Sequence, residues 1–324
     1  MTTKKNPAKS ANAAKKPAEI WDFIIIGGGP AGLSAAIYAA RFRMKALVLA
    51  KQPGGMVAFT HIVENYPGLG SLPGPELAEK LVQHAKMNKI PIREEEVTDV
   101  ARQGEMFSVK TKLGTYFAKS LLFATGTERR KLDAAGEERF ANKGVSYCAV
   151  CDGPLYKDKI VGVVGGSDAA AKEALFLARY AKKVYVIYRR EKIRAEPMTA
   201  AYVEREPKIE IIPNAVVAEI TGKNFAESVS LEDVNTKKRR ELALDGIFIE
   251  IGGVPGSALA KELGVALNEK SEIVIDRASQ TNVRGVFAAG DVGSSEYKQA
   301  ITAAAEGVVA AYSAYKFVRQ TTIA

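Results

Sequence analysis

The sequence has few of the residues on which several classes of protein depend. Two cysteines in 324 residues exclude a secreted scaffold held together by several disulfides. The two histidines, His61 and His84, show neither a Ser-His-Asp arrangement nor the spacing of a zinc finger. We therefore expect no metal site and no serine-hydrolase chemistry.

Long apolar segments are missing as well. A helix that crosses a bilayer needs roughly 18–20 apolar residues, and the longest candidate run, from Ala300, is broken by Glu306. The N-terminal lysines lead into a strand and then into glycines, which is not the pattern of a signal peptide. These absences predict a cytoplasmic protein, in which cysteines stay reduced unless they are catalytic.

The remaining composition is that of an ordinary globular protein, with 47% hydrophobic and 26% charged residues. The length corresponds to roughly two domains of about 150 residues each. The net charge of +9 is partly local, because residues 1–19 contain five lysines and one glutamate, a net charge of +4. This segment is predicted to be a disordered basic tail. Nucleic-acid binding is the alternative from a different class, but the basic residues lack interleaved aromatics or a helical stripe.

Two segments repeat the same order of strand, glycine turn and alanine-rich helix. The first consists of a strand at 22–26, Gly27-Gly28-Gly29-Pro30-Ala31-Gly32, a helix to 41 and a strand at 46–49. The second consists of a strand at 160–164, Gly165-Gly166-Ser167-Asp168-Ala169-Ala170, a helix to 180 and a strand at 184–188. Such strand–helix–strand units build parallel sheets. The sequence predicts an α/β protein with two Rossmann-like dinucleotide-binding domains.

Shorter elements are expected between and after these units. A β-meander is predicted at 109–123, with a turn at Leu113-Gly114, and strands are predicted at 209–212, 216–220, 228–234 and 246–251. The glycines of 252–256 indicate a linker. Beyond it we predict strands at 273–276 and 286–291 and a helix at 299–318, which serves either the core or a dimer interface.

The first glycine turn has the spacing of a pyrophosphate-binding loop. Gly27 permits the tight turn, Gly29 admits the pyrophosphate close to the backbone, and Gly32 lets the helix pack on the strand. The acidic residue that usually binds a ribose hydroxyl is missing, because the second strand ends at Ala50-Lys51. The ribose contact is therefore expected to come from elsewhere in the chain.

The second turn departs from the glycine pattern at Ser167 and Ala170, but basic residues follow its second strand. The run Tyr188-Arg189-Arg190-Glu191-Lys192-Ile193-Arg194 places arginines where an NAD-binding protein has an acid. Because the guanidinium fork suits a phosphate dianion, the run favours NADP(H) over NAD(H). The alternative is a solvated run of charges.

The only two cysteines lie together in Cys148-Ala149-Val150-Cys151-Asp152. Such a pair can close a small disulfide ring with a redox-tuned thiolate. Zinc binding is the alternative, and it lacks further ligands. Asp152 is placed either to exchange a proton with a thiolate or to cap the turn at Gly153-Pro154.

Taken together and in this order, the motifs resemble those of the low-molecular-weight thioredoxin reductases over residues 20–318. Besides the features above, the resemblance rests on Glu64-Asn65-Tyr66-Pro67-Gly68, Ala124-Thr125-Gly126, and Gly290-Asp291 followed by Gln299-Ala300. It implies an FAD-binding domain split into 20–127 and 254–324, with an inserted NADPH-binding domain at 128–253 that carries the cysteines. A homodimer is also implied.

The resemblance assigns residues to both cofactors. The implied FAD set is Gly27, Gly29, Pro30, Ala31, Gly32, Gly55, Asn65, Ala124, Thr125, Gly126, Gly290, Asp291, Lys298, Gln299 and Ala300. The implied NADPH set is Gly165, Gly166, Ser167, Asp168, Ala169, Arg189, Arg190 and Arg194.

It also implies a reaction sequence. Hydride passes from NADPH to FAD, the reduced flavin opens the Cys148–Cys151 disulfide, and the dithiol reduces a thioredoxin-like protein. Cys151 would lie against the flavin, Cys148 would attack the partner, and Asp152 would act as the acid. The dithiol and the NADPH site belong to the same inserted domain, and both must reach one flavin. We therefore expect this domain to rotate relative to the FAD-binding domain about hinges near 127–129 and 252–255.

Four residues depart from the family pattern: Met56, Ser167, Tyr188 and Lys298. Three of them belong to the pyridine-nucleotide side in the family. The alternative is therefore a sibling dithiol flavoenzyme that exchanges electrons with a reduced flavin, ferredoxin or oxygen instead of NADPH. A reductase that serves a separate peroxiredoxin is a further alternative.

Overall fold

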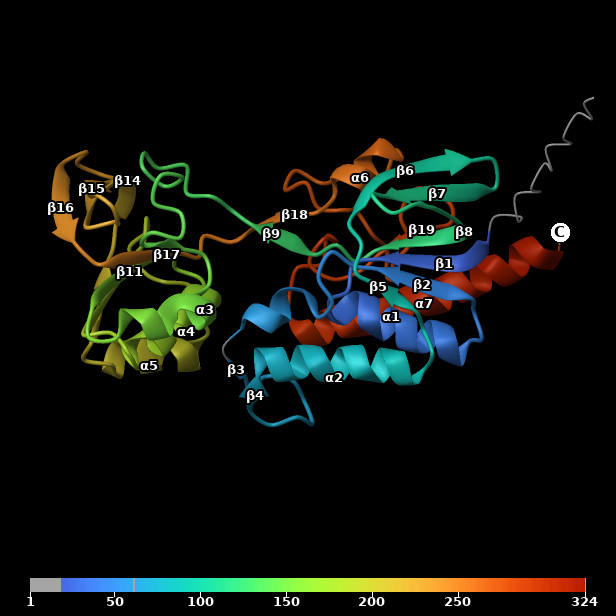
Figure 1. The fold of residues 1–324 in the computed structure, drawn as a ribbon, viewed down its shortest axis with the longest axis horizontal. Helices are drawn as coiled ribbons and strands as arrows, with labels where there is room; N and C mark the ends of the chain where they lie inside the picture. Colours follow the sequence, from blue (N-terminus) through green and yellow to red (C-terminus); the bar gives the residue numbers. More distant parts are fainter. Residues whose placement is uncertain (1–18, 61, 324) are drawn as a thin grey trace, which may run out of the picture.

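The computed structural model describes residues 19–60 and 62–323, without the side chains of the last three. The predicted basic tail, apart from Glu19, and His61 lie outside the described residues. The chain forms two lobes that are joined by two short strands (Figure 1). No helix in the described ranges has the length and apolar character needed to span a membrane.

The first lobe is built on a seven-stranded sheet with the order β5-β2-β1-β8-β7-β6, in which β19 also pairs with β8. Its strands are β1 (Ile20–Ile26), β2 (Ala46–Leu49), β5 (Ile92–Arg93), β6 (Val97–Gln103), β7 (Met106–Thr111), β8 (Thr115–Phe123) and β19 (Val286–Ala288). β2 and β8 pair parallel with β1, and β19 pairs parallel with β8. β7 and β8 form the antiparallel pair of the predicted meander, and β6, which was not predicted, adds a further antiparallel strand beside β7. The sheet therefore combines strands from both ends of the chain.

Helices α1 (Pro30–Arg41), α2 (Gly74–Met87) and α7 (Ala300–Ile323) lie below this sheet in Figure 1, and α6 (Ala258–Glu262) lies above it. A short 3₁₀ helix, η1 (Gly55–Phe59), and the hairpin of β3 (Ile62–Val63) and β4 (Leu72–Pro73) precede α2. The alanines of α7 are buried against α1 at Ala303, Ala310, Ala311 and Ala314. This face of α7 therefore belongs to the core, one of its two predicted roles.

The contact between α1 and α7 depends on Gly307, because a Cβ atom at this position would lie 2.0 Å from the Ala31 carbonyl oxygen. Replacing a glycine inside a helix by alanine normally raises the free energy of unfolding by up to about 1 kcal/mol. Here the clash with backbone should reverse the sign, and we expect Gly307→Ala to lower stability by about 1–3 kcal/mol. Thermal unfolding followed by circular dichroism measures the change.

Gly114→Ala is the matched control, because Gly114 has nothing within 4 Å of its Cβ position. A Gly307→Ala protein as stable as this control would contradict the close-packing argument.

The second lobe contains a five-stranded parallel sheet with the order β10-β17-β11-β12-β13. Its strands are β10 (Val145–Ser146), β11 (Ile160–Val164), β12 (Lys183–Ile187), β13 (Ile209–Ile212) and β17 (Gly246–Ile249). Helices α3 (Ala149–Asp152), η2 (Gly153–Tyr156), α4 (Asp168–Ala178) and α5 (Pro197–Arg205) cover one face. The antiparallel strands β14 (Ala215–Thr221), β15 (Ser228–Asp233) and β16 (Arg239–Ala243) cover the other. The predicted α/β class, with a three-layer second unit inserted into the first, is confirmed.

The two lobes are connected through β9 (Thr127–Arg129) and β18 (Gly253–Pro255). The predicted linker at 252–256 is thus not an open coil, because these strands pair antiparallel. The Thr125 hydroxyl donates a hydrogen bond of 2.7 Å to the Gly256 carbonyl oxygen beside them. Both chain crossings are therefore held together at one place.

Two expectations fail. The predicted strand at 273–276 forms only isolated bridges from Ile273 to Leu267 and Gly293, because no neighbouring segment runs alongside it for more than one residue. The predicted helix at 299–318 is present as α7, which begins at Ala300 and continues five residues beyond 318. Helices α2, α5 and α6 were not predicted. The other predicted strands are present within a few residues of their expected bounds.

Candidate dinucleotide and redox sites

The glycine turn after β1 is shaped by contacts that no side chain could enter. Gly27 has a φ of +114°, and a Cβ atom there would lie 2.1 Å from the Ala124 carbonyl oxygen. A Cβ atom on Gly32 would lie 2.0 Å from the Gly27 carbonyl oxygen. The turn therefore packs against the end of β8, as the roles predicted for both glycines require.

The N-terminus of α1 faces this turn with unused donors. Gly29 is the N-cap residue and Pro30 occupies the first turn, but no side chain caps the helix. Gly55 lies directly beside Gly29, since a Cβ atom on Gly55 would come within 2.7 Å of the Gly29 Cα atom. Uncapped backbone amides at the start of a helix bind phosphate groups, so this cradle fits the pyrophosphate of FAD.

The C-terminal segment returns to the same place. A Cβ atom on Gly290 would lie 3.1 Å from the Ala31 Cβ atom, so the predicted Gly290-Asp291 turn abuts the start of α1. Burial raises the pKa of Asp291, and Lys298 opposes this effect from nearby. The Lys298 ammonium donates a hydrogen bond of 2.8 Å to the Asp291 carbonyl oxygen and pairs with Glu272.

Two residues that lie 234 positions apart in the sequence are joined by a hydrogen bond. The Asn65 amide donates a hydrogen bond of 3.1 Å to Gln299 Oε1, just before Ala300 begins α7. A cleft of about 360 Å³ lies next to Asp291 and reaches the β9–β18 pair; it is lined by Thr127, Arg130, Gly253, Pro255, Lys270, Glu272, Asp291 and Lys298. The sequence-predicted FAD residues are thus gathered in the first lobe.

Two residues at this site were missed by sequence reasoning. Glu306 on α7 accepts a hydrogen bond of 2.7 Å from the Gly290 amide, and its helical position gave no signal. Glu96 lies beside Lys51, with 2.8 Å between ammonium and carboxylate, because β5 runs parallel to β2. An acidic side chain therefore does lie near the end of β2, but it belongs to the segment that follows β5.

The second turn is built like the first but carries its own caps. Gly165 has a φ of +152°, and a Cβ atom there would lie 2.1 Å from the Glu250 carbonyl oxygen. Ser167 caps α4, accepting a hydrogen bond of 3.3 Å from the Ala170 amide. The Asp168 carboxylate accepts from Lys172 at 2.8 Å and from the Glu196 amide at 2.9 Å, so its charge is paired rather than presented to an anion.

The basic run after β12 folds back onto this turn. The Tyr188 ring covers Gly166, where a Cβ atom would lie 2.4 Å from the ring. Arg194 donates from Nε to the Tyr188 hydroxyl at 3.0 Å and from its amide to the Gly166 carbonyl oxygen at 2.6 Å. Tyr188, a departure from the family pattern, therefore places Arg194 beside the turn.

Arg189 and Arg190 are exposed at the end of β12. Within the described ranges, no ion pair joins Arg189, Arg190 or Arg194 to a carboxylate. Three guanidinium groups next to a glycine turn fit a dinucleotide that carries an additional phosphate.

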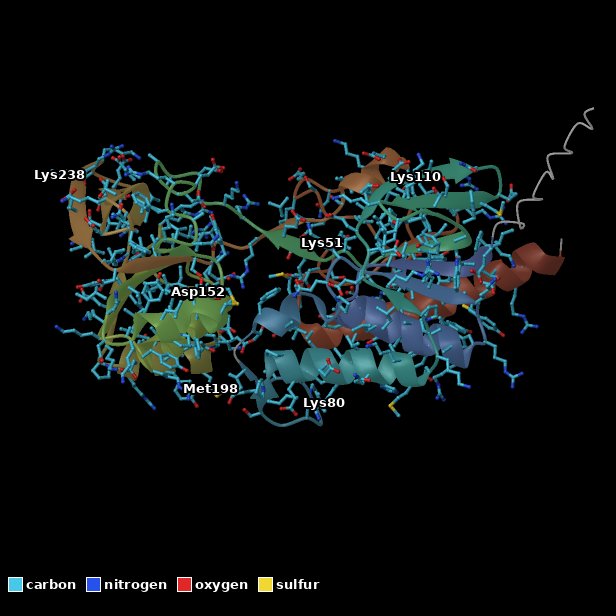
Figure 2. The ribbon with its side chains drawn as sticks, viewed as in Figure 1. Lys51, Lys80, Lys110, Asp152, Met198 and Lys238 are labelled. Atoms are coloured by element: carbon cyan, nitrogen blue, oxygen red, sulfur yellow. A yellow bond between two sulfur atoms is a disulfide. The ribbon has the colours of Figure 1, made fainter. Side chains whose placement is uncertain are left out.

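The two cysteines form a disulfide at the start of α3. Cys148 is the N-cap residue and its Sγ accepts a hydrogen bond of 3.2 Å from the Cys151 amide. Cys148 is half-buried and Cys151 is exposed. Asp152, which ends α3, lies at the edge of the second lobe that faces the first (Figure 2). A disulfide in this position is open to a second molecule.

In the part of the chain that the structure describes, no three His, Cys, Asp or Glu side chains gather at one place. His84 is exposed on α2.

Comparison with known proteins shows the family to which the chain belongs. The family model of the pyridine nucleotide-disulphide oxidoreductases matches residues 21–307. The thioredoxin reductase of Ureaplasma parvum is 38% identical over 301 residues, which cover 93% of this chain and 97% of that protein.

Solved structures agree. The thioredoxin reductase of Lactococcus lactis in the FR conformation is 38% identical, with a TM-score of 0.90 over 93% of this chain and 99% of that one. The thioredoxin reductase of Streptococcus pyogenes, 35% identical with the same coverage of both chains, gives a TM-score of 0.62.

Proposed function

Since the chain belongs to the pyridine nucleotide-disulphide oxidoreductases and, among them, to the thioredoxin reductases, we propose that it reduces a thioredoxin-like protein through Cys148 and Cys151. The observation that carries this assignment is the accessible Cys148–Cys151 disulfide on a lobe with its own dinucleotide-binding turn. As a member of this family the protein is an NADPH-dependent flavoprotein that binds FAD and NADPH.

The first lobe would hold FAD, with the uncapped start of α1 at the pyrophosphate, Asp291 at the ribityl or phosphate side, and Asn65 and Gln299 at the ring. The second lobe would hold NADPH, with Arg189, Arg190 and Arg194 around the 2′-phosphate. When bound, the two cofactors supply hydride transfer and two-electron redox chemistry.

The cysteines then carry out disulfide exchange. The Cys148 thiolate attacks one sulfur of the partner's disulfide, forming a mixed disulfide and releasing the other partner sulfur as a thiolate. The Cys151 thiolate attacks Cys148 Sγ, which restores the Cys148–Cys151 disulfide and releases the second partner thiol. Asp152, next to Cys151 in the chain, would exchange the protons that accompany these steps.

A change in lobe arrangement would serve both halves of this cycle, because the cysteines and the NADPH residues share one lobe. The TM-scores of 0.90 and 0.62 at nearly equal identity and coverage support it, since two rigid lobes placed differently lower the score in this way. The β9–β18 pair is the proposed hinge.

Assembly and location follow the family. We propose a homodimer, the commonest closed assembly, and the cytoplasm, where NADPH-driven disulfide reduction keeps thiols reduced.

An anaerobic titration of the flavin spectrum tests the proposal. NADPH at low excess should bleach the flavin absorbance, whereas NADH should change it only weakly. Oxidised thioredoxin added afterwards should restore the spectrum of the oxidised flavin. If NADPH fails while reduced ferredoxin or a reduced free flavin succeeds, the electron donor is the one expected for the sibling enzymes and the NADPH assignment is wrong.

A further inference from the structure

The residue that ends β10 binds the backbone of the first cysteine on both sides. Ser146 is buried, and its hydroxyl oxygen accepts a hydrogen bond of 3.0 Å from the Cys148 amide. The same hydroxyl donates a hydrogen bond of 3.4 Å to the Cys148 carbonyl oxygen. Because β10 pairs parallel with β17, Cys148 follows directly on the edge of the five-stranded sheet.

Tyr147, directly before Cys148, is bound to a second part of the lobe. Its hydroxyl donates a hydrogen bond to the Glu137 carboxylate. Glu137 is only 3% exposed, and it also accepts hydrogen bonds from the backbone amides of Leu132 at 2.9 Å and Asp133 at 2.7 Å. Burial first and the hydrogen bond to Glu137 second raise the pKa of Tyr147, so its hydroxyl keeps its proton and remains a donor.

The loop that carries Glu137 is itself fixed to the antiparallel strands of this lobe. The Ala135 carbonyl oxygen accepts a hydrogen bond of 2.8 Å from the Ile220 amide on β14. A Cβ atom on Gly136 would lie 2.1 Å from the Ile220 carbonyl oxygen, so the two backbones are in close contact. Tyr147 is therefore tied to a loop that has a fixed position on β14.

These bonds are made by groups other than the two sulfur atoms, so they can persist when the disulfide is opened. The Cys151 amide also donates a hydrogen bond of 3.2 Å to Cys148 Sγ. Two thiols that are held near each other form a disulfide more readily, because less conformational freedom is lost when the ring closes. The position of Cys148 in the reduced protein should therefore affect how readily the disulfide forms again.

We propose that Tyr147 and Glu137 are positioning residues for Cys148, which hold its backbone in place after reduction so that Cys151 can attack Cys148 Sγ. This attack closes the disulfide and releases the second partner thiol. Without the tie the reduced loop would gain conformational freedom, whereas the oxidised loop would stay constrained by its disulfide. The tie should therefore favour the disulfide. The proposal rests on the proposed function in taking Cys148 and Cys151 as the redox-active pair.

The test measures the dithiol–disulfide equilibrium of the FAD-loaded protein in anaerobic buffers of dihydrolipoate and lipoate. The two protein thiols are oxidised to the disulfide while the cyclic disulfide of lipoate is reduced to its dithiol, so electrons and protons balance. Rapid alkylation with N-ethylmaleimide followed by mass spectrometry counts the free thiols. Tyr147→Phe keeps the ring and loses the hydroxyl. We expect half-oxidation at a ratio of dihydrolipoate to lipoate about three- to tenfold lower than in the unchanged protein.

Two further variants separate this tie from a general loss of stability. Glu137→Gln replaces an acceptor oxygen by a donor amide and should lower the ratio as well. Tyr147→Phe added to Glu137→Gln should lower it further by less than about twofold, since both changes remove the same hydrogen bond. Tyr116→Phe is the matched control, because the Tyr116 hydroxyl donates a hydrogen bond of 2.9 Å to Glu95 in the first lobe. It should leave the ratio unchanged.

An unchanged or higher ratio for Tyr147→Phe would overturn the proposal, and so would an equal fall for Tyr116→Phe. Independent effects in the double variant would overturn the pairing of Tyr147 with Glu137. If Glu137→Gln does not fold, the comparison of Tyr147→Phe with Tyr116→Phe decides. The measurement uses neither NADPH nor thioredoxin, so failure of the reductase assignment would be seen in the flavin titration and not here.

Discussion

Cys151→Ser and Cys148→Ser should each lower thioredoxin reduction by roughly a thousandfold or more, because either change removes one half of the exchange reaction. The two variants should nevertheless differ in what they trap. Cys151→Ser keeps the attacking thiol and loses the resolving one, so it should accumulate a mixed disulfide through Cys148. Cys148→Ser should not. A thioredoxin with one active-site cysteine, activated as its thionitrobenzoate disulfide, allows the adduct to be measured by mass.

Retained FAD in both variants shows that the first lobe is intact. Lys159→Ala, at an exposed position before β11, is the control for a surface change in the same lobe and should keep full activity. Trapping through Cys151 instead of Cys148 would exchange the two proposed roles. Substantial turnover in either variant would show that the pair is not the route of the electrons.

Replacing Arg189 and Arg190 together by alanine should remove the preference for NADPH. A hydrogen bond to a charged group contributes about 1.5–3 kcal/mol, so the loss of two should lower kcat/KM for NADPH by roughly a hundredfold to ten-thousandfold. NADH lacks the 2′-phosphate and should be used as before. The affinity for adenosine 2′,5′-bisphosphate, measured by calorimetry for the unchanged protein and for the double variant, tests the same phosphate contact without turnover.

Lys192→Ala is the matched control, since Lys192 is an exposed cation in the same loop. An equal loss for NADPH and NADH would indicate a damaged lobe rather than a lost phosphate contact. If the double variant keeps its preference, Arg189 and Arg190 are solvated charges, the alternative that the sequence left open, and Arg194 or another group selects the cofactor.

The sequence was most informative where local chemistry dictates the backbone. Gly27 and Gly165 sit in turns with positive φ and no room for a side chain, so strand, turn and helix could be read from spacing alone. The link between Asn65 and Gln299 could be predicted only through the family resemblance, because nothing local joins residues so far apart.

The contacts that were missed all depend on tertiary packing. Glu96 reaches the end of β2 only because β5 pairs with that strand, and Glu306 meets Gly290 only because α7 returns across α1. The false strand at 273–276 has the right residue types but no partner of sufficient length.

Because β9 pairs antiparallel with β18, the segment that forms the second lobe begins and ends at neighbouring points of the first lobe. Thr127 lies opposite Pro255 and Arg129 lies opposite Gly253, so the segment leaves and re-enters the first lobe through adjacent points. A segment with neighbouring ends can be inserted, lengthened or exchanged without stretching the chain that receives it. The electron-delivering part of this fold could therefore be replaced as a unit, while the first lobe, which closes its sheet with β19, remains the same.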